Sequence, residues 1–317
     1  MADFLLIGGS FASAWLVTWL GCALILLLVY PVLRKRLLSW HPAVSSRMLL
    51  LLLAVPFFLS LSTTTMLFLP VTESSLVSEH CHENCQTHMP LLDSMWLGAA
   101  GLLVVFLVAC TMLGKLLFNI RTAKKLMQHL VGIGKDTGNW YQLPDSQPVV
   151  FTLGWWRNRI FVTKGLLQQC DAKDIDIILQ HELAHGKRLD NLRLLLARMF
   201  LMILPARFSQ GIYADLHLFT ESACDFAAAE KYGELDVAET LMRVQKLVPR
   251  EFSYFDNELV SAFTGAEVEQ RIRNLAAGSD QFSNLQYVQS LCLIALVSLS
   301  FILVDPMHHG IEWLLQL

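Results

Sequence analysis

The chain has 317 residues, of which 54% are hydrophobic and only 16% are charged. Soluble globular proteins usually carry fewer apolar and more charged residues, so the composition predicts a membrane protein. The formal net charge is −3, and the sequence has no basic face and no basic segment interleaved with aromatic residues. Direct binding to nucleic acid is therefore not expected.

Four uncharged, apolar windows predict four membrane-spanning helices. They are residues 11–33, 48–70, 94–114 and 285–304, and windows of this length suffice to cross a hydrocarbon layer of about 30 Å. The basic cluster 34–36 follows the first apolar run instead of preceding it, which is the reverse of a cleavable signal peptide. The first window is therefore expected to remain as a helix.

The distribution of lysine and arginine predicts the orientation of these helices. Basic residues occur at 34–47 and at 115–273, whereas 71–90 and the tail after Val304 have none. By the positive-inside rule both termini lie outside. The membrane is expected to be the plasma (inner) membrane of a bacterium. The predicted organisation is helices 1 to 3 in 1–118, with a cytoplasmic loop at 34–47 and an outer loop at 71–90, then a cytoplasmic domain at 119–284, helix 4 at 285–304 and an outer tail at 305–317.

The outer loop contains the sequence SEHCHENCQTHM, which is dense in nitrogen and sulfur ligands of the kind that zinc and copper prefer. One interpretation is an external metal-sensing loop that biases the helices. The other is a disulfide between two cysteines with incidental histidines, since the outside can be oxidising. The residues concerned are His80, Cys81, His82, Cys85 and His88.

The cytoplasmic segment begins with a predicted basic helix at 121–130, followed by loops rich in Gly, Pro, Asp and Asn at 132–148. Two β-rich runs, 149–152 and 159–163, are separated by a turn-like segment and predict a hairpin. We also considered residues 160–163 as a sheet edge that binds an extended substrate by strand addition.

The segment QHELAHGKRLDN contains two histidines four residues apart. Asp171 is a good N-cap, and apolar residues recur after it at helical spacing, so both histidines are placed on a helix. Residues four apart share a helix face, so His181 and His185 can both reach one ion, while Glu182 stands beside the ion as a general base. The alternative is two histidines on the polar side of an ordinary soluble helix.

A catalytic zinc site needs a third protein ligand and one open position. Glu221 and Asp225 share a face of a second predicted helix, from Ile212 to about Tyr232, that Gly233 closes. Small neighbours such as Ala223 would let this helix approach the first closely. We expect Glu221 to be the third ligand and Asp225 to orient a histidine; the alternative is an exposed acidic pair.

Between these two helices lies the apolar run 194–205, which Arg198 interrupts. It is too short and too charged for another span. Packing under the site is the first interpretation, and contact with the bilayer is the second.

The sequence HELAHGKRLDN followed by ESACD resembles the integral-membrane zinc metallopeptidases of the β-lactam and methicillin-resistance sensor-transducer (antirepressor) family. The layout from the first to the fourth span is also similar, as are the segments RNRIFVTKGLL and VEQRIRNL. The resemblance implies a mainly α membrane protein with a gluzincin-like α+β metalloprotease domain between helices 3 and 4. It also implies zinc ligands at His181, His185 and Glu221, Glu182 as base, and Asp190 as a carboxylate that closes the motif helix. Those sensors end in a penicillin-binding domain that this chain does not have, so direct β-lactam sensing is not expected.

The predicted activity is peptide hydrolysis with Zn²⁺. The leading hypothesis is that the chain relays an external signal by cutting a cytoplasmic protein, by resemblance a winged-helix repressor. Self-cleavage and the oligomeric state stay open. A housekeeping membrane protease of the HtpX or CAAX-processing type is the second hypothesis, and the short spacing between His185 and Glu221 favours the relay. A non-catalytic metal-binding receptor is the third.

Candidates for stabilising an oxyanion are Tyr213, His217, Arg271 and Arg273, by residue type alone; surface or packing roles are the more ordinary interpretation for each.

Overall fold

The computed structural model describes residues 2–68, 92, 94–247 and 265–277, together with single residues between 298 and 310. The chain divides into two compact units, one made of Met1–Arg34, Leu51–Gly114 and Ser283–Leu317 and the other of Lys35–Leu50 and Lys115–Phe282. The predicted outer loop with His80, Cys81, His82, Cys85 and His88 lies outside the described residues, and so does most of the predicted fourth span.

Three long apolar helices account for the first three predicted spans. They are α1 (Ala2–Ser39), α2 (Pro42–Phe68) and α3 (Met95–Ile133), and all three are long and apolar enough to cross a membrane. At a rise of about 1.5 Å per residue, α3 is much longer than a bilayer core is thick. Its second half contains the basic segment 121–130, so the predicted basic helix is confirmed as a continuation of the third span.

In the first unit, α1 and α3 approach closely through small residues. A Cβ atom added to Gly9 would lie 2.7 Å from the Cα of Gly98, so the two backbones meet where neither has a side chain. Beside this contact the Ser13 hydroxyl donates to the Leu97 carbonyl at 3.4 Å. Glycine and serine at such a crossing are the usual means by which membrane helices pack without a hydrophobic driving force.

The second unit contains a four-stranded sheet in the order β1-β2-β4-β3. The strands are β1 (Lys135–Asp136), β2 (Tyr141–Leu143), β3 (Val150–Leu153) and β4 (Arg159–Thr163). The predicted hairpin is confirmed, because β3 and β4 pair antiparallel.

Two expectations about this sheet are wrong. The segment 132–148, expected to be loops, contains β1 and β2; strands of two and three residues are too short to show an alternating pattern. Because β4 pairs with β2 on one side and with β3 on the other, it has no open edge, and strand addition at 160–163 is excluded. Among the described strands the edge on this side is β3.

Helices make up the rest of the unit: α4 (Lys164–Gln169), α5 (Ala172–Arg188), α6 (Asp190–Leu201), α7 (Ala206–Tyr232), α8 (Glu234–Leu247) and α9 (Gly265–Ala277). The predicted N-cap of the motif helix is confirmed, since the Asp171 carboxylate accepts from the Asp174 amide at 2.8 Å. Gly233, with φ 88°, ends α7 as expected. That helix begins at Ala206, earlier than the expected Ile212, because Pro205 precedes its first turn and Gly211 does not break it.

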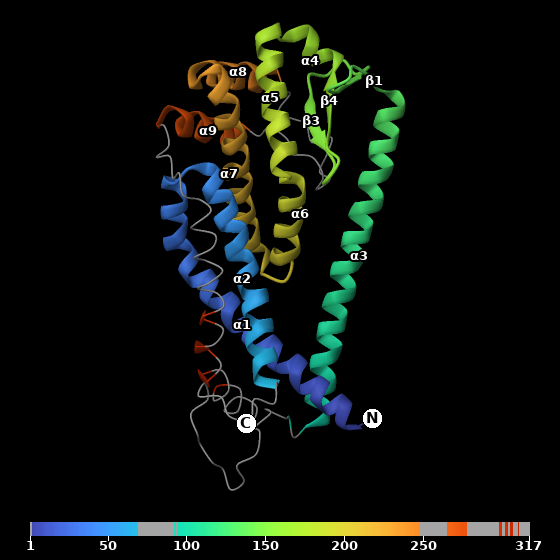
Figure 1. The fold of residues 1–317 in the computed structure, drawn as a ribbon, viewed down its shortest axis with the longest axis vertical. Coiled ribbons are helices and arrows are strands. Elements are labelled where there is room, and N and C mark those ends of the chain that lie inside the picture. The colour runs from blue at the N-terminus through green and yellow to red at the C-terminus, as the bar shows by residue number, and fades with distance from the viewer. Residues whose placement is uncertain are drawn as a thin grey trace. The chain divides into compact units, whose positions relative to one another are not determined.

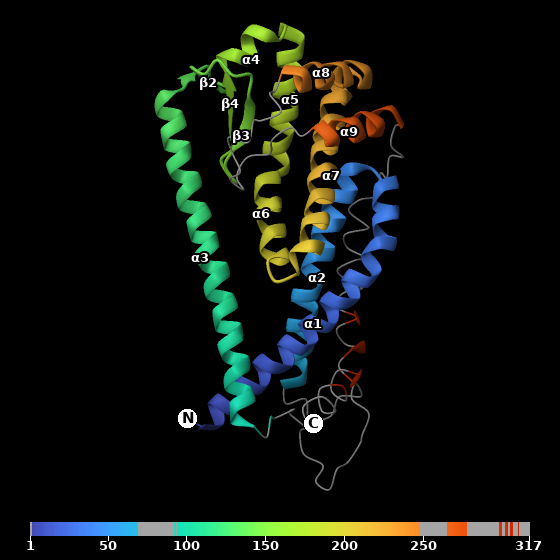
Figure 2. The same cartoon turned by 180° about the vertical axis from the view of Figure 1, so that it is seen from behind.

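The motif helix α5 lies at the centre of this unit, with β3 on one side and α7 on the other (Figures 1 and 2). Helices α8 and α9 pack on α7, around a buried apolar cluster that includes Ile177, Val237 and Val268. In α6, Leu194, Leu195, Ala197 and Leu201 are buried, which agrees with the core interpretation of that apolar run.

Candidate metal centre

His181 and His185 occupy one face of α5, as their spacing predicts. Both side chains are buried, and their rings meet edge to face with centroids 4.8 Å apart. Their Nε2 atoms are 3.1 Å apart. The helix therefore presents two imidazole nitrogens to the same point in space.

The carboxylate of Glu221, on α7, lies against both of these nitrogens. Oε2 is 3.4 Å from His181 Nε2 and Oε1 is 3.3 Å from His185 Nε2. Donor atoms bound to a tetrahedral zinc at 2.0–2.1 Å are expected to be about 3.3 Å from one another. The separations of the three donor atoms therefore match the size of a zinc site.

The opposite nitrogen of each ring faces a buried carboxylate. His181 Nδ1 is 3.0 Å from Asp225 Oδ1, and His185 Nδ1 is 3.1 Å from Asp190 Oδ2. When each carboxylate accepts a hydrogen bond from Nδ1–H, the lone pair of the neutral ring lies on Nε2, which faces the cage. Two lone pairs and a carboxylate that face one another over a few ångströms are stabilised by positive charge, either protons on the rings, whose pKa values are raised, or a metal ion. The donor set therefore fits a divalent metal ion.

The environment of the cage attracts positive charge. Burial by itself lowers the pKa of His181, yet the hydrogen bonds to Asp225 and Glu221 outweigh burial and raise it. Burial likewise favours the neutral form of Glu221, but the charge of His185 and that of Arg271 hold the pKa of this carboxyl well below its usual range. Glu221 is thus ionised, as a metal ligand has to be.

Arg271, on α9, pairs with the carboxylates of this site, a role that the sequence did not reveal. Its side chain is 1% exposed and forms two hydrogen bonds with Asp225, Nε to Oδ2 at 2.7 Å and Nη2 to Oδ1 at 2.6 Å. Its Nη1 lies 3.1 Å from Glu221 Oε2. We considered Arg271 as an oxyanion donor or a packing residue, but its guanidinium is engaged by the two carboxylates. Arg271 therefore stabilises Glu221 and Asp225 by ion pairing.

The other oxyanion candidates lie elsewhere. Arg273 is a surface residue, with its side chain 69% exposed and paired with Glu269. Tyr213 packs its ring against the guanidinium of Arg198, at 4.5 Å. His217 lies one turn before Glu221 on α7, and it does not belong to the groups of close donor atoms that the described residues form.

The junction of α5 and α6 places Asp190 against His185. Leu189 ends α5 in the left-handed conformation, with φ 55°, which is uncommon for a residue with a branched side chain. The resemblance implied that Asp190 closes the motif helix; instead Leu189 ends it and Asp190 opens α6. Arg188 Nε donates to Asp190 Oδ2 at 3.1 Å, so this carboxylate is also held from its far side.

Glu182 is oriented by β3, the edge strand. The hydroxyl of Thr152 donates to Glu182 Oε2 at 2.7 Å, and both residues are buried. Asn191 anchors the same strand, because its amide donates to the carbonyls of Thr152 at 2.9 Å and of Gly154 at 3.0 Å. The one sequence signal for Thr152 is a hydroxyl residue inside the apolar run VVFTL.

Cys224 belongs to a second group of close donor atoms, with His185 and Asp190. Its Sγ is 3.3 Å from His185 Nδ1 and 3.4 Å from Asp190 Oδ2. Burial raises the pKa of this thiol to about 12, although His185 opposes the shift. Metals bind the thiolate, so a thiol that keeps its proton at neutral pH is a weak ligand, and the Nε2 side of the histidines is the better cation site.

Comparison with known families agrees with this geometry. Residues 121–277 match the model of Peptidase family M48, whose members are generally zinc-dependent, and the matched range contains every residue of the cage from His181 to Arg271. A search of curated proteins gives no match. The matched domain and the three apolar helices support a metallopeptidase of the membrane type.

Proposed function

We propose, from the match to Peptidase family M48 and the donor cage together, that the chain is a membrane-embedded zinc metalloendopeptidase. The observation that carries the proposal is the triangle of donor atoms from His181, His185 and Glu221, with both opposite ring nitrogens held by carboxylates. Such an arrangement holds ligands in one orientation before the metal arrives.

In this proposal the two histidines and Glu221 hold Zn²⁺. When bound, zinc supplies Lewis acidity, which lowers the pKa of a water molecule and polarises a carbonyl group. Glu182, next to His181 on the same helix, accepts the proton of the attacking water and passes it to the leaving amine. Thr152 holds one oxygen of that carboxylate, at 2.7 Å, and so fixes the direction in which Glu182 points.

For the biological role, we propose cleavage of a cytoplasmic protein in response to an external signal, with a transcriptional repressor as the expected substrate. The ligand-rich segment 80–88 motivates the external signal. The M48 match is equally compatible with housekeeping proteolysis of the HtpX type. The two roles differ in what is cut, since a relay has one regulatory target and a housekeeping protease removes many damaged membrane proteins.

The experiment that tests the enzyme is a comparison of Glu182→Gln with the intact chain. Loss of a general base slows hydrolysis by about 10²- to 10⁴-fold, while the zinc ligands are untouched. We expect protein fragments in membranes of cells with the intact chain that are absent with Glu182→Gln, and equal zinc content in the two purified proteins. Identical fragment patterns would leave the non-catalytic receptor as the better account.

The identity of the fragments separates the two roles. Fragments of one repressor that appear only after an external stimulus, and that disappear in a Cys81→Ser, Cys85→Ser variant, support the relay. Fragments of many misfolded membrane proteins, independent of that stimulus, support housekeeping.

A further inference from the structure

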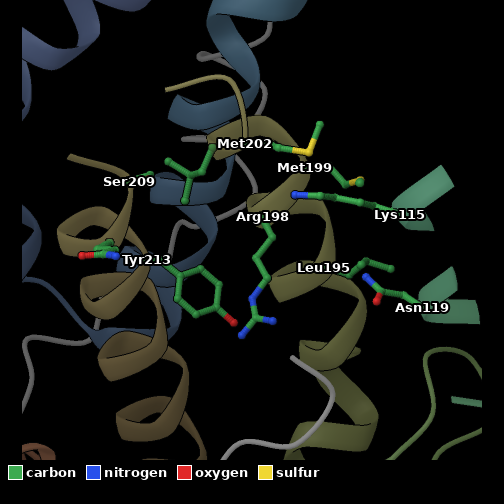
Figure 3. Close-up of a pocket in the computed structure, with 10 residues that line it drawn as sticks. Lys115, Asn119, Leu195, Arg198, Met199, Met202, Ser209 and Tyr213 are labelled. Carbon is green, nitrogen blue, oxygen red and sulfur yellow. The ribbon is translucent and has the colours of Figure 1, made fainter. Parts of the chain in front are cut away.

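A second site lies away from the cage, in a pocket of about 280 Å³ between α3 and the hairpin formed by α6 and α7 (Figure 3). Three elements contribute polar groups to its lining: Lys115 and Asn119 from α3, Arg198 from α6, and Ser209, Gln210 and Tyr213 from α7. Leucine and methionine side chains, among them Met199 and Met202, complete it. The pocket therefore combines cationic and apolar surface.

The charge of the pocket selects for an anion. Lys115 and Arg198 both line it, and no carboxylate is among the described residues of the lining. The guanidinium of Arg198 packs against the ring of Tyr213 at 4.5 Å, which restricts its orientation. Figure 3 shows Arg198 and Tyr213 facing each other from their two helices, with Lys115 extending from α3 toward α6. A planar guanidinium with a nearby ammonium group suits a phosphate.

The position of Lys115 along α3 sets the depth of the pocket relative to the bilayer. No charged residue occurs in 95–114, and Lys115 is the first one on this helix after the apolar run. A lysine at the end of an apolar span lies at the level of the lipid headgroups. The phosphates of the lipids lie at the same level.

The hairpin also presents apolar side chains. Leu196 on α6 is 41% exposed and Phe208 on α7 is 49% exposed. A soluble anion has no use for the methionine and leucine walls, whereas a molecule with a phosphate and an acyl chain uses both kinds of surface.

We propose that this pocket binds the headgroup phosphate of an anionic phospholipid. Lys115 and Arg198 bind the phosphate, and the apolar walls contact the start of an acyl chain. Because Arg198 is on α6, which begins with Asp190, and Tyr213 is on α7, which carries Glu221, the lipid would bridge a helix that supports a ligand and a helix that supplies one. The proposal goes beyond the peptidase and does not require it.

The test measures lipid binding to the full chain, purified in neutral detergent and stripped of lipid. Phosphatidylglycerol and zwitterionic phosphatidylcholine are titrated separately, and bound lipid is counted by native mass spectrometry. The pocket variants are Lys115→Gln, Arg198→Gln and the charge-preserving Arg198→Lys. The matched controls are Lys125→Gln on α3 and Arg207→Gln on α7, which remove exposed charges outside the pocket.

We expect preference for phosphatidylglycerol, with each neutralised pocket cation weakening its binding about fivefold and Arg198→Lys keeping most of it. The controls should bind as the intact chain does. Equal losses in pocket variants and controls, or no loss in either, would overturn the proposal, since binding would then be spread over the surface. Displacement of the lipid by an equal concentration of glycerol 3-phosphate would also overturn it, in favour of a soluble phosphate ester. Lys115 is exposed, so Lys115→Gln decides the question even if the Arg198 variants fold poorly.

Discussion

Helix α7 carries opposite chemistry at its two ends. Around Glu221 and Asp225 it presents buried carboxylates to two histidines, and around Tyr213 it faces a pocket lined by cations. The buried end requires partners for every charge, because an uncompensated ion in a protein interior is costly, and Arg271 and the histidines supply them. In the pocket, Lys115 is exposed to solvent, and the guanidinium of Arg198 packs against the ring of Tyr213. We infer that the cage is built for one cation, whereas the pocket is suited to an anion.

The largest expected effect on stability follows from Arg271→Leu, which removes the cation of the buried end of the site. The change leaves Asp225 and Glu221 buried without their cation, and removal of one partner of a buried pair typically costs about 3–5 kcal/mol. Arg273→Leu, two residues along the same helix but with a side chain 69% exposed, should change the unfolding free energy by less than about 0.5 kcal/mol. Thermal unfolding of the full chain in detergent measures both. Similar losses in the two variants would mean that the buried pairs do not hold the domain together.

The next effect concerns the carboxylates behind the histidines. Asp225→Asn and Asp190→Asn keep the side-chain shape but remove the charge that fixes the Nδ1 proton of each ring. We expect zinc affinity to fall about 10- to 100-fold in each variant. Competition with a calibrated chelator measures the change, and Asp236→Asn is the control, at a partly exposed aspartate of α8 that pairs with Lys173 away from the cage. Unchanged zinc affinity would show that the imidazole rings of the two histidines bind the ion without a carboxylate at Nδ1.

A smaller effect is expected for Thr152→Val, which removes the hydroxyl bound to Glu182. A hydrogen bond to a charged group contributes about 1.5–3 kcal/mol, so kcat should fall about tenfold or more. Zinc content and KM should stay the same, because neither the ligands nor the substrate contacts change. Thr152→Ser should restore kcat. A change confined to KM would assign Thr152 to substrate binding instead of to orientation of the base.

The smallest effect should follow from Cys224→Ser. Since burial raises the pKa of the thiol to about 12, we expect it to contribute packing and not a metal ligand. Zinc stoichiometry should be unchanged, and the unfolding free energy should shift by only about 1 kcal/mol. Loss of zinc would indicate that the metal uses the donor group of His185, Asp190 and Cys224.

Much of the architecture could be predicted because its signals are local. The first three apolar windows, the cap at Asp171 and the stop at Gly233 are local signals in the sequence, and each recurs in the structure. The approach of Glu221 to the histidines could be inferred from the small residues around it. The roles of Thr152 and Arg271 could not be inferred from the sequence, because each residue acquires its role by contact with a residue far away in the chain. The two arginines of RIRNL are typical of a solvated helix face, and only the packing of α9 on α7 shows that Arg271 is buried.

The central claim is that His181, His185 and Glu221 hold one divalent cation, and metal analysis tests it most directly. We predict one tightly bound zinc per purified full-length chain, with X-ray absorption showing two nitrogen ligands and at least one oxygen ligand from the protein. Glu221→Ala and His185→Ala should lose the zinc, whereas Glu182→Gln should retain it. A chain that binds no zinc, or whose zinc survives both ligand substitutions, would contradict the account.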